Sequence, residues 1–103
     1  STRSAGAIVW SGEWDGTEYT VVASGNQEGL VFSSTREPRQ GREETVTIQL
    51  PDDEQVPLQI GEDGESGTEV VSGLSMEAFS AMKRLEVRLS GGVVINLVND
   101  PSA

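Results

Sequence analysis

Two acid-rich turns carry the side chains of this sequence that are best suited to hold a cation. Asp52, Asp53 and Glu54 share one turn, and Glu62, Asp63, Glu65 and Glu69 lie in or beside the next. Oxygen ligands on adjacent loops are what Ca²⁺ requires, but the run from Glu62 to Gly67 lacks the spacing of an EF-hand loop. We therefore predict no metal site, and interpret these acids first as charge that keeps a small protein soluble.

Three arginines form a second group with binding chemistry. Arg36, Arg39 and Arg42 lie close together in a polar segment that contains Pro38 and Gly41 and is typical of a loop. Guanidinium groups in a loop can bind a phosphate, a carboxylate or an acidic partner through paired hydrogen bonds. The alternative is that they pair with Glu37, Glu43 and Glu44 in the same segment.

The aromatic residues near the start of the chain form a third group. Trp10 is expected to end a strand, Trp14 to lie in the following turn, and Tyr19 to lie across the hairpin. Beside the carboxylates of Glu13 and Asp15, these rings can form a patch that stacks on a sugar or binds a peptide. The alternative places Trp10 in the core, with Trp14 covering one end of the fold.

Catalysis has little support in the composition. The chain has no histidine and no cysteine, so serine and cysteine triads, thiolate metal sites and disulfides are excluded. There is no phosphate-binding glycine-rich loop of the Walker type. A pair of carboxylates can perform acid–base chemistry only if they share a cleft that raises one pKa. We expect a protein that is not an enzyme and has no cofactor.

Charge narrows the class of partner. The formal net charge is −10, with 17 acids against 7 bases, which argues against nucleic acids and anionic membranes as partners. No Lys or Arg lies between Glu43 and Met82. We predict a protein partner, and a basic one would be steered towards this acidic segment. The residues expected at the rim of the contact are Asp52, Asp53, Glu62, Asp63 and Glu65.

Alternating apolar residues between turn signals predict about seven or eight short strands. The expected strands span 7–10, 17–23, 30–34, 45–50, 56–60, 69–72, 85–89 and 93–98. Pro57 cannot donate to a ladder, so its strand is expected at a sheet edge. We predict a mainly β fold, an antiparallel β-sandwich or open barrel, with residues 1–6 as a flexible lead-in and 7–99 as one domain. No apolar run approaches the length of a membrane helix.

The end of the chain predicts one helix and one hairpin. Ser75 is a suitable N-cap for a short helix over about 76–83. A two-residue loop at Gly91-Gly92 would place Val87 beside Asn96, whereas a three-residue loop places Val87 on Ile95. We favour the three-residue loop, because Leu85, Val87, Leu89, Ile95 and Leu97 then share one buried face, with Val94 and Val98 on the other.

The C-terminal half resembles one known family. A strand ending at Leu50-Pro51, an extended segment through Pro57-Leu58 and Gly61, the short helix at Met76–Met82 and the alternating strand Leu85–Leu89 resemble the invasion-associated locus B family of bacterial envelope proteins. The paired cysteines of that family are absent here. The resemblance implies a β-sandwich in the cell envelope and a non-enzymatic role, and it supplies no functional residues.

These patterns together favour a small binding module, periplasmic or secreted, with the cytoplasm as the alternative location. Two other functions stay open. One is an acidic inhibitor or immunity-type protein that covers a basic partner, which would bind tightly and lose affinity steeply with salt. The other is a carboxylate-dependent, carbohydrate-active enzyme. Partner contacts are expected from the five acids of the rim, from Trp14, and from Arg36, Arg39 and Arg42; the oligomeric state is left open.

Overall fold

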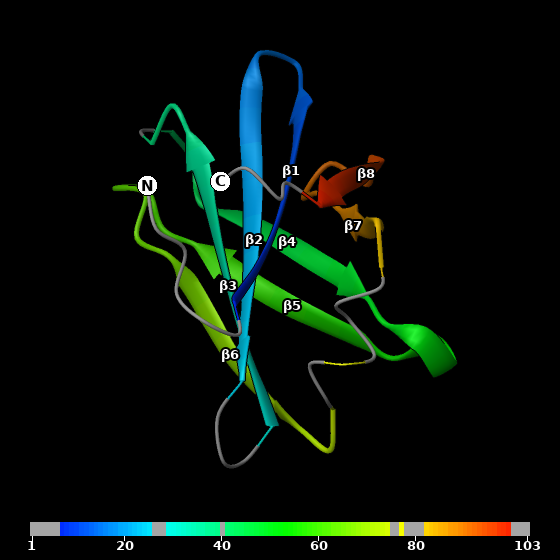
Figure 1. Cartoon of the computed structure of the whole chain (residues 1–103). Coiled ribbons are helices and arrows are strands. Elements are labelled where there is room, and N and C mark those ends of the chain that lie inside the picture. Colours follow the sequence, from blue (N-terminus) through cyan, green and yellow to red (C-terminus); the bar gives the residue numbers. More distant parts are fainter. Residues whose placement is uncertain (1–6, 26–28, 40, 75–76, 78–81, 100–103) are drawn as a thin grey trace.

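The chain folds into one nearly closed, barrel-like antiparallel sheet (Figure 1). The computed structural model describes residues 7–25, 29–39, 41–74, 77 and 82–99. Within these residues the strands are β1 (Ala7–Trp14), β2 (Thr17–Gly25), β3 (Gly29–Glu37), β4 (Glu44–Gln49), β5 (Gln55–Ile60), β6 (Gly67–Ser72), β7 (Arg84–Arg88) and β8 (Val94–Asn99). A single 3₁₀ turn, η1 (Pro51–Asp53), joins β4 to β5. The mainly β, open-barrel prediction is confirmed.

The strand order is β5-β4-β7-β8-β1-β2-β3-β6, so the two end strands are β5 and β6. The sheet curls until these ends meet, and a Cβ atom added to Gly67 on β6 would overlap the backbone of Gln59 on β5. Glycine is required there because two backbones approach closely. Pro57 lies on β5, the end strand, as its missing N–H predicted.

Alternation along each strand separates a buried inner face from an outer one. The inner positions supply a compact core, and its largest fully buried side chains are Trp10, Phe32, Leu30, Ile48, Leu58, Ile60, Leu85, Leu97, Val21, Val46 and Val87. Trp10 is in the core, as one of the two sequence interpretations held. Its indole Nε1 donates a hydrogen bond to the Met82 carbonyl oxygen at 3.2 Å, which satisfies the polar end of the ring.

The hairpin formed by β7 and β8 has the predicted three-residue loop. Val87 is paired with Ile95 and Leu85 with Leu97. The Leu89 N–H donates to the Val93 carbonyl at 2.8 Å, which closes the loop over residues 90–92. Gly92 has φ +86°, the left-handed conformation that such a loop needs. The predicted inner residues are buried, except that Ile95 is partly buried; Val94 and Val98 are exposed on the outer face.

Two predicted segments fall mainly or wholly on residues outside the described part of the chain. These are the helix over 76–83 and the lead-in over 1–6. Glu77 is helical, whereas Met82 and Lys83 are not, so the predicted helix extends too far at its C-terminal end. Met82 and Lys83 instead lead directly into β7, and the Lys83 carbonyl accepts a hydrogen bond from the Asn99 N–H of β8 at 2.8 Å.

The register of the last hairpin makes a sharp prediction. Val87→Asp should place an unpaired carboxylate in the core, because Val87 is 0% exposed, and should cost about 3–5 kcal/mol of folding free energy. The matched control is Val98→Asp, since Val98 is 51% exposed on the neighbouring strand. Urea unfolding followed by circular dichroism measures both. Equal stability of the two variants would contradict the register.

The close approach at the ends of the sheet makes a second prediction. Gly67→Ala should force β6 away from β5 because its Cβ would overlap the Gln59 backbone, at a cost of about 1–3 kcal/mol. Gly91→Ala is the control, because a Cβ at Gly91 would meet nothing within 4 Å. Thermal denaturation distinguishes the two variants, and a Gly67→Ala protein as stable as the control would mean that the end strands do not touch.

Candidate functional site at the loop end of the barrel

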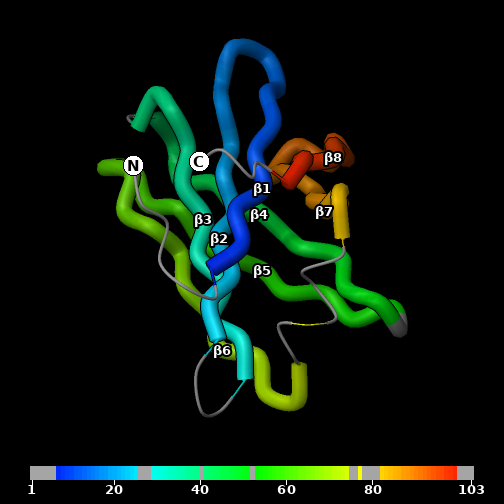
Figure 2. Tube along the Cα trace, in the orientation of Figure 1, coloured from blue at the N-terminus to red at the C-terminus, as the bar shows by residue number. Residues whose placement is uncertain are grey.

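One end of the barrel gathers most of the polar residues with possible function, and we call it the loop end. It carries the β1–β2 turn, the β3–β4 and β5–β6 connections, and the tip of the β7–β8 hairpin. The Thr45 N–H donates to Ser90 Oγ at 2.7 Å, which joins β4 to that tip. Gly64 of the β5–β6 connection packs on Arg39 of the β3–β4 connection. Figure 2 shows the β1–β2 hairpin extending beyond the neighbouring strands at this end.

A buried polar cluster lies on the inner face of the loop end. Arg36 and Tyr19 are directly opposite each other on β3 and β2. Glu44, at the start of β4, accepts a hydrogen bond from the Tyr19 hydroxyl at 2.8 Å and one from Arg36 Nη1 at 3.3 Å, both at Oε1. Arg36 is only 6% exposed and Glu44 is 16% exposed. The cluster therefore ties β2 and β3 to β4 through a partly desolvated ion pair.

The cluster holds Tyr19 in its neutral form. Burial, the hydrogen bond to Glu44 and the negative charge of that carboxylate raise the pKa of Tyr19 from 10.0 to about 12, while the positive charge of Arg36 opposes the increase. A phenol that donates to a carboxylate in this way acts as a fixed hydrogen-bond donor. The same contacts occupy Glu44, so its carboxylate serves as an acceptor for two neighbours.

The inner face of β3 also carries donors without an acceptor among the described residues. Three buried side-chain atoms make no hydrogen bond to any described residue: Nε and Nη2 of Arg36, and Oγ of Ser34. Ser34 and Arg36 are two positions apart on β3, so both side chains point to the inside. Buried polar groups are almost always paired in folded proteins, so these three atoms leave part of the inner face of β3 unsatisfied.

The outer face of the same strands has the opposite character. Glu13 lies directly opposite Glu18, and Glu18 lies directly opposite Glu37. All three side chains are exposed. We call Glu13, Glu18 and Glu37 the acidic row. Like charges directly opposite each other on neighbouring strands destabilise a sheet by several tenths of a kcal/mol or more, so the row works against the stability of the isolated protein.

Trp14 lies at the tip of the β1–β2 hairpin, and its side chain is on the opposite face of β1 from Glu13 of the acidic row. It is 45% exposed and belongs to β1 rather than to a turn, since the turn consists of Asp15 and Gly16 alone. Both turn residues have positive φ, at 51° and 78°, the geometry of the Asp-Gly turns common in two-residue hairpin loops. The tight turn holds the indole on a rigid projection that a partner can reach.

The structure divides the five acids predicted at a partner rim into two groups. Glu62, Asp63 and Glu65 lie in the β5–β6 connection and are exposed at the loop end. Asp52 and Asp53 lie in η1, at the opposite end of the β4–β5 hairpin. Strands of this length separate the two turns by about 20 Å, so a partner that contacts all five acids must span that distance along the β4–β5 hairpin.

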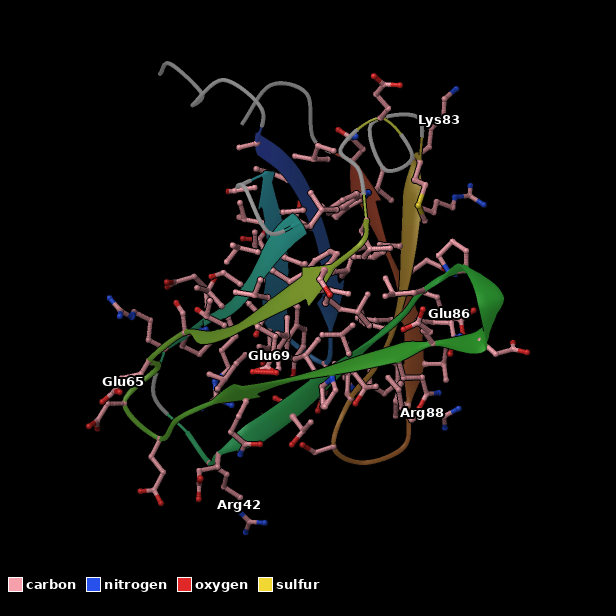
Figure 3. The ribbon with its side chains drawn as sticks, turned by 90° about the horizontal axis from the view of Figure 1, so that it is seen from below. Arg42, Glu65, Glu69, Lys83, Glu86 and Arg88 are labelled. Atoms are coloured by element: carbon pink, nitrogen blue, oxygen red, sulfur yellow. The ribbon has the colours of Figure 1, made fainter. Side chains whose placement is uncertain are left out.

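The three predicted arginines also separate. The predicted loop starts later than expected, because β3 continues to Glu37 and places Arg36 in a strand with a buried side chain. Arg36 pairs with Glu44, one of the acids proposed as a structural partner. Arg39 and Arg42 lie in the β3–β4 connection and are exposed. In Figure 3 the Arg42 side chain points away from the barrel.

A basic surface lies on the outer side of β7. Lys83, Arg84 and Arg88 are exposed around Glu86, and Figure 3 shows Lys83 and Arg88 pointing away from the barrel on a different side from Glu65. Arg84 and Arg88 lie opposite the exposed residues Val98 and Val94 of β8. The positive charges of β7 and the acids of the loop end therefore occupy different surfaces.

Sequence reasoning did not connect Tyr19 to the pair of Arg36 and Glu44, and did not place Ser34 on the buried face. One signal was present, because Leu30, Phe32, Ser34 and Arg36 continue a period of two that places Arg36 on the inner face. The acidic row carried no signal before the register was known, since Glu13, Glu18 and Glu37 meet only through strand pairing.

Neither family models nor curated proteins nor solved structures match this chain significantly. The resemblance to the invasion-associated locus B family stays a prediction. Over the residues that the structure describes, no group of three or more acids is arranged to hold a metal ion. No helix in that part of the chain is long and apolar enough to cross a membrane.

The raised pKa of Tyr19 predicts how stability depends on pH. Because the pKa is higher in the folded protein, the protonated phenol favours the fold, and its contribution is complete below pH 10 and lost as the pH rises through about 12. The chain has one tyrosine, so the tyrosinate absorbance reports on this residue alone. The folded protein should titrate well above the urea-unfolded chain, whereas equal midpoints would mean that the hydroxyl is free in solution.

Proposed function

We propose that this chain is a non-enzymatic binding module that takes a basic protein or peptide segment at its loop end. The acidic row is the observation that carries the proposal. Two directly opposed pairs of carboxylates destabilise the free protein, and a cationic partner would remove that repulsion. The indole of Trp14 is exposed at the tip of the same hairpin, on the opposite face from Glu13, so a partner that wraps around the projecting tip would touch both.

The neighbouring charges support electrostatic steering towards this end. Glu62, Asp63 and Glu65 extend the negative surface from the β5–β6 connection. Arg39 and Arg42 are exposed at the same end but are outnumbered by its acids, and the exposed bases of β7 lie on another side of the molecule. The charge distribution would therefore orient an approaching basic partner. An inhibitor or immunity-type protein that covers a basic partner would use the same surface. From the family resemblance we also propose a periplasmic or secreted location.

A carbohydrate-active enzyme is less well supported. Such an enzyme needs two carboxylates that face one cleft. Glu44, the partly buried carboxylate of the loop end, already accepts hydrogen bonds from Tyr19 and Arg36. The acidic row lies on the outer face of the sheet, where its carboxylates are exposed.

Neutralising the acidic row tests the proposal. The probe is a synthetic lysine-rich peptide, and its association is followed through tryptophan fluorescence in a stopped-flow instrument at low salt. The variant Glu13→Gln, Glu18→Gln, Glu37→Gln should associate severalfold more slowly and show a weaker salt dependence. It should also be more stable than the parent by about 0.5–1 kcal/mol, because two repulsive pairs are removed.

The matched control removes the same amount of charge at the other end of the molecule. Asp52→Asn, Asp53→Asn, Glu54→Gln should leave the association rate close to that of the parent protein. If both triple variants slow association equally, net charge alone attracts the probe and the loop end is not a binding surface.

A further inference from the structure

The outer face of β7 and β8 sets two arginines beside two valines. Arg84 lies directly opposite Val98, and Arg88 lies directly opposite Val94. Val98 is 51% exposed and Val94 is 45% exposed, and both arginines are exposed as well. Figure 3 shows Arg88 pointing away from the barrel. We call these the two Arg–Val pairs, and each presents a positive charge and an apolar side chain together to solvent.

The two residues of each pair are close neighbours. The Leu89 N–H donates to the Val93 carbonyl at 2.8 Å, so these residues form a hydrogen-bonded pair at the end of the ladder. Pairs alternate along an antiparallel ladder, so Arg88 and Val94 form a non-hydrogen-bonded pair, as does the other Arg–Val pair. Side chains approach most closely in such pairs. One side chain of a partner can therefore touch the guanidinium and the valine together.

The arginines of this face are not paired with an acid of the described chain. The ion pair that the described residues form joins Arg36 to Glu44 on the inner face, and neither Arg84 nor Arg88 takes part in one. The chain has 17 acids against 7 bases, so internal acids are plentiful. Two exposed guanidinium groups on one face are thus available to the acids of another molecule.

The charge pattern along β7 limits which acids fit. Glu86 stands between the two arginines on the same face, so the face reads positive, negative, positive. The neighbouring strands add no charge where they pair with it, since Thr47 lies opposite Arg88 and Ser11 lies opposite Val98. The arginines are four residues apart, or about 13 Å along an extended strand. A matching partner needs two acids at this spacing with a non-acidic group between them.

We propose that the two Arg–Val pairs are a docking surface for an extended acidic protein segment that places one glutamate on each pair. The carboxylate of each glutamate accepts hydrogen bonds from the guanidinium, and its methylene groups cover the valine. Glutamates four positions apart in an extended segment match the spacing of the arginines, and the position midway carries a neutral side chain over Glu86. This surface is separate from the acidic row, which is proposed for a basic partner.

Charge complementarity favours this partner over two others. A nucleic acid carries an unbroken row of phosphates, and Glu86 would repel those that lie between the two arginines. A second copy of this chain would offer its acidic row, in which three glutamates stand side by side. The central one, Glu18, would then face Glu86, and like charges in contact are unfavourable.

The test is a titration with a synthetic peptide, followed through the backbone amide signals by nuclear magnetic resonance at low salt. The probe has two glutamates four positions apart, a glutamine midway and serine elsewhere. We expect saturable shifts confined to β7 and β8, with a dissociation constant on the order of a millimolar. Replacing both glutamates of the peptide by aspartate keeps the charge but removes a methylene group from each, and should weaken binding severalfold. Replacing both by glutamine should abolish it.

Variants of the arginines connect the shifts to the surface. Arg84→Gln, Arg88→Gln should lower the affinity for the glutamate peptide about tenfold, because both guanidinium contacts are lost. The matched control Arg39→Gln, Arg42→Gln removes the same charge from exposed positions of the β3–β4 connection, and should leave the affinity within about twofold of the parent protein.

A third variant tests the apolar half of each pair. Val94→Ser, Val98→Ser should weaken binding of the glutamate peptide severalfold while leaving its salt dependence unchanged, because no charge is altered. The fold should persist in all three variants, since every substituted side chain is exposed, and the amide spectrum checks this directly.

Four results would overturn the proposal. Equal affinity for the glutamate and aspartate peptides would mean that the valines take no part. Equal losses in the two arginine variants would mean attraction by net charge alone. Tighter binding of a single-stranded oligonucleotide to the same residues would identify a nucleic-acid surface. Self-association of the parent protein that is lost in Arg84→Gln, Arg88→Gln would identify a second copy as the occupant.

Discussion

The ion pair between Arg36 and Glu44 is the constraint on which the loop end depends. β3 and β4 are not hydrogen-bonded to each other in the sheet, so the pair crosses the interior rather than following a ladder. A guanidinium that is 6% exposed would be strongly destabilising if it stood alone. The sheet must therefore curl far enough to bring Glu44 to Arg36, and Tyr19 fixes the same carboxylate from β2.

The sheet can curl this far because the backbones of its two end strands, β5 and β6, can approach each other closely. Gly67 lets the backbone of β6 approach Gln59 of β5 without a side chain between them. Pro57 removes a donor from β5, which limits unwanted pairing along an edge strand. In a chain with few aromatic residues this closure adds buried apolar area, because curling the sheet buries the inner positions of every strand.

Much of the fold follows from local pattern, and most of the site does not. The period of two and the loop length of the last hairpin were sufficient to place Val87 on Ile95. Strand limits were less certain, and extending β3 by three residues changes Arg36 from a loop residue to a buried one. Pairing of Arg36 with Glu44 was one of the alternatives that the sequence offered. The contact of Tyr19 with Glu44 could not be predicted, because proximity across the barrel depends on closure, which no local pattern encodes.

The strands of the loop end carry opposite chemistry on their two faces. On β3, Arg36 points inwards with donors to satisfy, while the next residue, Glu37, points outwards into the acidic row. Alternation keeps these charges on opposite sides of the sheet, where solvent screens the outer acids and the interior does not screen the guanidinium. The outer carboxylates repel one another in solvent, while the inner guanidinium is held by Glu44, so the same strands carry charge of opposite sign on their two faces.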